Sequence, residues 1–144
     1  MSSLQIKILV LFIVCAFNNA NAGSIDDAFK ALSQFNYFEA KKQFEKSLKS
    51  NESAANYGLA MIYYRTDNPF HQLDSEYVKI LRSEKAYGMM KDKQKEALKK
   101  YNFDYAAIES LRKDISSALF KVVLEKPSEE AYDLYQKNNP WADE

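Results

Sequence analysis

The chain has 144 residues, of which 47% are hydrophobic and 14% aromatic, and this composition excludes a disordered protein. Its 20 Lys and Arg residues balance 20 Asp and Glu residues, so no net positive charge directs it to nucleic acid or to an anionic membrane. It has only three glycines and three prolines, too few for the many turns of a sandwich or barrel. The length fits one domain, and the scarcity of turn residues favours long helices.

The N-terminal segment has the three parts of a secretory signal peptide in the expected order. Lys7 supplies the cation, residues 8–17 form an apolar run, and the small residues Ala20 and Ala22 precede Gly23. We therefore expect cleavage between Ala22 and Gly23. The apolar run has about ten residues, whereas a bilayer-spanning helix needs about 20, so an uncleaved membrane anchor is the weaker alternative.

Cleavage of residues 1–22 determines both the location and the chemistry of the mature domain, residues 23–144. We expect an exported protein of the periplasm, the cell envelope or the extracellular medium, without stable membrane insertion after cleavage. The only cysteine, Cys15, lies inside the leader, and Val14 before it differs from the Gly, Ala or Ser of lipoprotein signals. The mature domain therefore has no thiol for a disulfide, a metal or a nucleophile.

After the leader, apolar residues recur at intervals of three and four, which predicts helices and no strands. Ser24, Ser53 and Asp104 are candidate N-caps, and Asp74 or Ser75 is the candidate for the fourth helix. The predicted helices cover residues 25–34, 37–48, 54–65, 75–90, 91–101, 105–126 and 129–137. We expect an all-α fold of six or seven helices, in which short connections place successive helices antiparallel as hairpins.

Two predicted helical segments have small and aromatic residues at regular packing positions. They are residues 36–48 (NYFEAKKQFEKSL) and residues 57–64 (YGLAMIYY). The first resembles the second helix of a tetratricopeptide repeat, and the other resembles the first helix of the next repeat. Ala28 and Ala60 lie 32 residues apart, near the family's period of about 34. Gly58 and Ala60 are small enough for a neighbouring backbone to approach closely.

The resemblance covers residues 24–81 well and implies stacked antiparallel hairpins, a fragment of an α-solenoid. Two features depart from the family pattern. The first repeat has Ala28 but lacks the aromatic and leucine before it, and residues 66–74 replace a tight turn. This stretch resembles a loop inserted in envelope-directed proteins of the same repeat type, which are often longer and multidomain. An N-terminal or accessory helical part of a larger envelope enzyme or assembly is therefore the alternative interpretation.

By matching positions, the resemblance implies that Tyr57, Met61, Tyr64 and Arg65 line the inner surface of the array, which the first helix of each pair forms. Aromatic residues, Met and Arg are enriched at protein interfaces. We expect a protein or peptide partner there, and core packing is the alternative role of these side chains. The predicted function is an exported scaffold for protein–protein interaction, with a purely structural spacer as a further alternative.

The sequence contains no recognisable catalytic apparatus, cofactor motif or metal cluster. His71 is the only histidine, and we expect its ring to pack in its loop with a hydrogen bond to backbone or water. No glycine-rich phosphate loop occurs. Residues 91–100 carry five lysines, which we interpret as a solvated helix with Glu96 paired to Lys100. We expect a protein that is not an enzyme and binds no cofactor, no metal and no nucleic acid.

Overall fold

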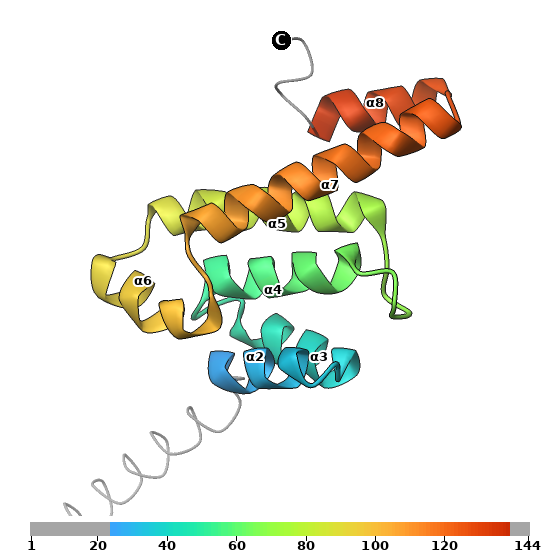
Figure 1. Ribbon diagram of the computed structural model, residues 1–144. Helices are drawn as coiled ribbons and strands as arrows, with labels where there is room; N and C mark the ends of the chain where they lie inside the picture. The colour runs from blue at the N-terminus through green and yellow to red at the C-terminus, as the bar shows by residue number, and fades with distance from the viewer. Residues whose placement is uncertain (1–23, 139–144) are drawn as a thin grey trace, which may run out of the picture.

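The computed structural model describes residues 24–138, and helices form nearly all of this part of the chain (Figure 1). Seven α-helices, one short 3-10 helix and no strand occur between these bounds. The predicted all-α class and the predicted number of helices are therefore confirmed. The expected leader, residues 1–22, and its cleavage site between Ala22 and Gly23 lie outside the described residues.

The helix bounds agree with the predicted bounds to within two residues. The helices are α2 (Ile25–Ser33), α3 (Tyr37–Ser47), α4 (Glu52–Tyr64), α5 (Leu73–Gly88), α6 (Asp92–Leu98), η1 (Lys99–Tyr101), α7 (Tyr105–Glu125) and α8 (Glu129–Asn138). The only division that the sequence did not predict is that of residues 91–101, which form α6 and the 3-10 helix η1.

Two of the predicted N-caps are confirmed. The Ser24 hydroxyl accepts a hydrogen bond from the Asp26 amide at the start of α2, and the Asp104 carboxylate accepts one from the Ala107 amide at the start of α7. Each bond satisfies a backbone donor that the first helical turn leaves without a partner. Asn36 performs the same role for α3.

The predicted N-cap at Ser53 is wrong, because α4 begins at Glu52, one residue earlier. Ser53 faces the neighbouring helix instead, where its hydroxyl donates to the Ser83 carbonyl at 2.8 Å. The prediction of Asp74 or Ser75 as N-cap of α5 is also wrong, since the helix already begins at Leu73. At Ser53 a tertiary contact thus outweighs the local capping preference.

The helices are layered in chain order, from α2 and α3 through α4 and α5 to α7 and α8 (Figure 1). Helix α4 packs against α3 and α5 along the chain and also against α2 and α7. Hairpin connections produce antiparallel neighbours. The stacking of these hairpins into a solenoid remains a prediction. The core between the layers contains the fully buried side chains of Phe44, Leu59, Ile62, Tyr77, Ile80, Phe103, Ile108 and Ile115.

Helix α6 and η1 lie beside this stack and not within it (Figure 1). They connect α5 to α7. The end of η1 and the residues after it lie against α2 and α4. Phe103, directly after this segment, is fully buried against the rings of Tyr57 and Tyr87, at centroid distances of 5.2 and 5.6 Å. Residues 99–103 therefore cover one side of α4.

Close packing at Gly58 is confirmed, although the neighbour is a ring and not a backbone. A Cβ atom on Gly58 would lie 2.1 Å from Cζ of Phe44, far inside van der Waals contact. Phe44 is fully buried, and its ring packs edge-on against Phe29 at 5.1 Å. Only a residue without a side chain allows α3 and α4 to approach in this way. No helix within residues 24–138 has an apolar stretch that would cross a bilayer.

Candidate functional site: an aromatic groove between α2, α4 and η1

Three of the four predicted partner-binding residues line one open groove of about 560 Å³, which we call the aromatic groove. They are Tyr57 and Met61, one turn apart on α4, and Arg65, which directly follows the helix. The remaining walls come from α2 and Phe35 after it, and from η1 and Asn102 after it. The lining residues are Phe29, Lys30, Leu32, Ser33, Phe35, Tyr57, Met61, Arg65, Lys100, Tyr101 and Asn102.

The fourth predicted residue, Tyr64, does not reach the aromatic groove. It lines a neighbouring hollow between α4 and α7, the α4–α7 cleft, together with Thr66, His71 and Lys121. Arg65 lines both hollows, because it lies at the end of α4 between them. The inner surface implied by the tetratricopeptide resemblance is thus divided into two hollows that meet at Arg65.

Tyr57 belongs to both the core and the groove. Only 8% of its surface is exposed, and its ring packs against Phe103. Burial raises the pKa of its phenol above the ordinary value, so the side chain stays neutral at physiological pH. Phe29 and Leu32 are equally buried beside it. These side chains form a rigid apolar floor, while Met61 is half-buried.

Contacts between η1 and α2 hold one wall of the groove in place. The ring of Tyr101 stacks on Phe29 with centroids 4.5 Å apart and planes 11° apart. The Tyr101 hydroxyl donates to the Asp26 carboxylate, which also pairs with Lys100 at 3.3 Å. The Tyr101 hydrogen bond, with help from Lys100, holds the pKa of Asp26 below its ordinary value, so this carboxylate is ionised at neutral pH.

Phe35 forms the opposite rim and has an unusual backbone conformation. Its φ is +58°, in the left-handed region, where a side chain is unfavourable and glycine is preferred. The bonds Phe35 N to Leu32 O and Asn36 N to Ala31 O, both 3.0 Å, form a Schellman motif that ends α2. Its ring is nevertheless 61% exposed. The ring contacts Tyr37 edge-on at a centroid distance of 6.4 Å and lies under the Arg65 guanidinium, so these two contacts oppose the cost of the left-handed backbone.

Asn102, on the other side of the groove, also has a positive φ, of +56°. Within residues 24–138, Phe35 and Asn102 are the only non-glycine residues in this conformation, and both line the aromatic groove. Residues in sparsely populated backbone conformations concentrate at functional sites, where the surrounding structure maintains them. This coincidence distinguishes the aromatic groove from the other hollows.

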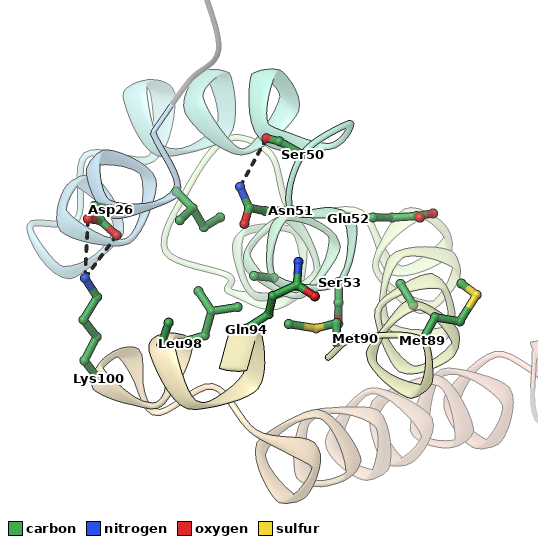
Figure 2. A pocket seen from close by; sticks show the side chains of 14 residues that line it. Asp26, Ser50, Asn51, Glu52, Ser53, Met89, Met90, Gln94, Leu98 and Lys100 are labelled. Atoms are coloured by element: carbon green, nitrogen blue, oxygen red, sulfur yellow. Dashed lines mark hydrogen bonds and ion pairs between the residues drawn. The ribbon is translucent and has the colours of Figure 1, made fainter. Parts of the chain in front are cut away.

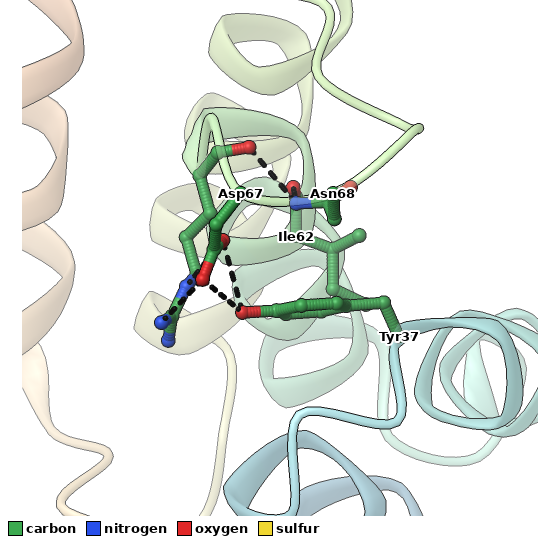
Figure 3. Close-up of polar contacts among 5 residues, drawn as sticks. Tyr37, Ile62, Asp67 and Asn68 are labelled. Atoms are coloured by element: carbon green, nitrogen blue, oxygen red, sulfur yellow. Dashed lines mark hydrogen bonds and ion pairs between the residues drawn. The ribbon is translucent and has the colours of Figure 1, made fainter.

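A polar network fixes Arg65 at the rim of the groove, and Figure 3 shows the Asp67 carboxylate of this network facing the Tyr37 hydroxyl. Its Nε and Nη2 atoms donate to the Asp67 carboxylate at 3.2 and 3.1 Å, and the Tyr37 hydroxyl donates to the same carboxylate at 2.9 Å. The Arg65 bonds, followed by that of Tyr37, lower the pKa of Asp67 below its ordinary value. The guanidinium also lies over the ring of Phe35, 5.0 Å from its centroid.

Asn68 explains how the chain leaves α4 at this network. Its side-chain amide donates to the carbonyls of Ile62 and Arg65, both at 2.8 Å, and its carbonyl accepts from the Phe70 amide (Figure 3). The last carbonyls of a helix lack partners within the helix, so one side chain here satisfies two of them. The loop that the sequence identified as an insertion thereby positions Asp67 against Arg65.

Two other hollows are less well suited to a specific ligand. A pocket of about 500 Å³ lies between the start of α4, the end of α5 and α6, where Asn51, Gln94 and the exposed Met89 line it (Figure 2). The carboxylate residues Asp26 and Glu52 are among the lining of that pocket. In the α4–α7 cleft, Nδ1 of His71 donates to the Tyr63 carbonyl at 2.8 Å, which confirms the expected hydrogen bond to backbone.

The predicted pairing of Glu96 with Lys100 is wrong. Glu96 pairs with Lys99 at 2.6 Å, and Lys100 reaches across to Asp26 on α2. The reason is the change from α6 to the tighter η1 at Lys99, which alters the directions of successive side chains. One lysine of the solvated helix therefore contributes to the groove.

Sequence reasoning identified the α4 side of the groove but missed the η1 side. Tyr101 lies 75 positions from its partner Asp26, and no local pattern connects them. The sequence did contain an indication that Phe35 is unusual. Glycine usually follows a helix, and the helix end before Asn36 lacks one. The mixture of basic, aromatic and Asn residues at 99–102 was a weaker indication that this segment contributes to a binding site.

The arrangement has the composition of a binding site. Within residues 24–138, no group of three His, Cys, Asp or Glu side chains is placed to hold a metal ion. The aromatic groove combines a rigid apolar floor with cations at its rim, which is the composition of interface anchor sites.

No family model, curated protein or solved structure matches the chain, so the tetratricopeptide resemblance stays a prediction.

Proposed function

We propose that the chain is an exported helical interaction module that binds a protein partner in the aromatic groove and catalyses no reaction. The observation that carries the proposal is Phe35, whose ring is exposed at a position where glycine is favoured. The left-handed backbone favours glycine here, and the contacts of the ring with Tyr37 and Arg65 leave most of its surface exposed. A ring held at the rim over Arg65, and facing a groove with Tyr57 in its floor, has the properties of a binding anchor.

Export is the second part of the proposal, and it rests on the N-terminal sequence. Residues 1–22 combine a cation, a short apolar run and small residues before Gly23. We therefore place the binding module in the periplasm, the cell envelope or the medium. Mass spectrometry of the protein purified from its host checks this placement, with Gly23 as the expected first residue.

Site-specific cross-linking tests the groove directly. We would introduce the photoreactive analogue p-benzoylphenylalanine at Phe35 in the full chain, produce it in its host and identify the covalent products. Phe38 is the matched control, because its ring is 68% exposed on α3 but lines none of the three hollows. We expect a discrete adduct from position 35 and none of the same mass from position 38.

Substitutions then measure how much the partner depends on the rim. Phe35→Gly relieves the backbone and removes the ring, and we expect about tenfold weaker partner binding, whereas Phe38→Ala should retain it. Circular dichroism checks that both variants are folded. Equal binding by wild type and Phe35→Gly, or the same adduct from both positions, would contradict the assignment of the groove.

A module of a larger assembly is the second candidate, and the last two helices favour it. Phe120 and Leu124 on α7 and Tyr132 on α8 are 45%, 63% and 52% exposed. End units of helical arrays usually have a polar outer face. Leu124→Glu should release the chain from a larger native complex in size-exclusion chromatography, and an unchanged elution volume would argue against this candidate.

A further inference from the structure

The cations around the aromatic groove come from three separate elements. Lys30 lies on α2, Arg65 follows α4 and Lys100 lies on η1, whereas no carboxylate is among the lining residues. Asp26 and Asp67, which pair with Lys100 and Arg65, are not among the lining residues, although their side chains are 60% and 53% exposed. Lys30 is exposed and forms no ion pair with any residue between 24 and 138. The rim therefore carries an excess of positive charge, located at Lys30.

The floor between these cations is apolar and preformed. Phe29, Leu32 and Tyr57 expose less than a tenth of their surface, and the rings of Tyr101 and Phe35 are also among the lining. A volume of about 560 Å³ accepts side chains of a few residues, and the open side leaves room for a backbone to pass. A ligand complementary to both features has an apolar side chain with carboxylates beside it.

We infer that the aromatic groove binds an acidic peptide segment in which an aromatic or large aliphatic side chain is flanked by carboxylates. This inference rests on the proposed function and specifies the chemistry of the partner. The apolar side chain occupies the floor between Phe35 and Tyr101. The flanking carboxylates interact with Lys30 and with the exposed parts of Arg65 and Lys100.

Fluorescence anisotropy with defined peptides tests the inference on the full chain. The probe is a fluorescein-labelled octapeptide with one central tryptophan between glutamates, and two comparison peptides replace the glutamates by glutamine or by lysine. We expect the acidic peptide to bind at least tenfold more tightly than the glutamine peptide, and the lysine peptide not to bind. Raising the salt concentration should weaken binding of the acidic peptide only.

A pair of charge reversals locates the contact. Lys30→Glu should weaken the acidic peptide about fivefold, whereas Lys49→Glu should leave its affinity unchanged. Lys49 is the matched control, since it is also exposed, lies just beyond the end of α3 and lines none of the three hollows. Both variants change the net charge of the chain equally, so only the position of the charge differs.

The outcomes separate this inference from the proposed function. Equal affinity for the acidic and glutamine peptides, with loss of both in Phe35→Gly, would overturn the acidic class and leave the groove as a binding site. Equal effects of Lys30→Glu and Lys49→Glu would also overturn it. Binding to phosphatidylglycerol vesicles that depends on Lys30, without peptide binding, would overturn it in favour of a membrane surface. Loss of the cross-link from position 35 is the outcome that concerns the proposed function itself.

Discussion

Gly58 provides the sharpest test of how the helices pack. Replacing it by alanine places a Cβ atom 2.1 Å from Cζ of Phe44 and 2.4 Å from two further ring atoms, where contact distances are about 3.5 to 4 Å. The ring would have to move by more than about 1 Å. It has no free space to do so, because Phe44 is fully buried and packs edge-on against Phe29.

The expected magnitude is the difference between two opposing effects. Overpacking a core costs about 1 to 3 kcal/mol, and an overlap of this size belongs at the upper end. Alanine in place of glycine within a helix gains about 1 kcal/mol. We therefore expect Gly58→Ala to lower the free energy of unfolding by about 2 kcal/mol. Gly88→Ala is the matched control, since a Cβ atom there meets nothing within 4 Å and should be neutral or stabilising.

Urea titration followed by circular dichroism at 222 nm measures both variants under the same conditions. A second substitution checks the mechanism, because Phe44→Leu makes space for the new methyl group. Gly58→Ala with Phe44→Leu should be more stable than the sum of the single effects implies, by about 1 kcal/mol or more. If Gly58→Ala is as stable as Gly88→Ala, or if Phe44→Leu gives no such coupling, the close approach of α3 and α4 is refuted.

Three further predictions concern the groove and its surroundings. Phe35→Gly should be about 1 kcal/mol more stable than Phe35→Ala in urea titration, because only glycine adopts φ near +58° without cost; the reverse order would argue against the left-handed conformation. Tyr101→Phe should raise the pKa of Asp26 toward its ordinary value in carboxyl carbon NMR titration, since the Tyr101 hydrogen bond is the main cause of its lowering; an unchanged pKa would refute that contact. Burial raises the pKa of Tyr57 and Tyr77, so on raising the pH the unfolded chain loses its phenol protons before the folded chain does. The contribution of these phenols to the free energy of unfolding should therefore be constant up to about pH 10 and fall above it. Urea titrations at pH 8 and pH 11 test this expectation.

Much of the fold was predictable because its signals are local. The three- and four-residue spacing of apolar side chains predicted most of the helices, and the caps Ser24 and Asp104 fixed two helix starts. The caps failed where tertiary contacts outweighed local preference, as at Ser53, whose hydroxyl bonds to the Ser83 carbonyl on α5. Local capping energies are about 1 kcal/mol, which packing of two helices readily exceeds.

The groove was predictable only on its α4 side. Tyr57, Met61 and Arg65 were implied by the tetratricopeptide resemblance together with the residue types typical of interfaces. The opposite walls depend on contacts between residues far apart in sequence, such as Phe29 with Tyr101 and Asp26 with Tyr101. Periodicity carries no information about these contacts, because they depend on where the segment after α6 turns back.

The glycine in the core and the aromatic groove are physically connected. Gly58 allows the ring of Phe44 to enter between α3 and α4; Phe44 then packs on Phe29 at 5.1 Å, and Phe29 stacks on Tyr101 at 4.5 Å. The wall formed by Tyr101 is thus supported by a continuous series of rings that begins in the core. A groove built in this way is formed before a partner arrives, and binding then requires little ordering of the protein. Its flexible parts are confined to the rim, where Lys30 is exposed and free to adjust to the charges of a ligand.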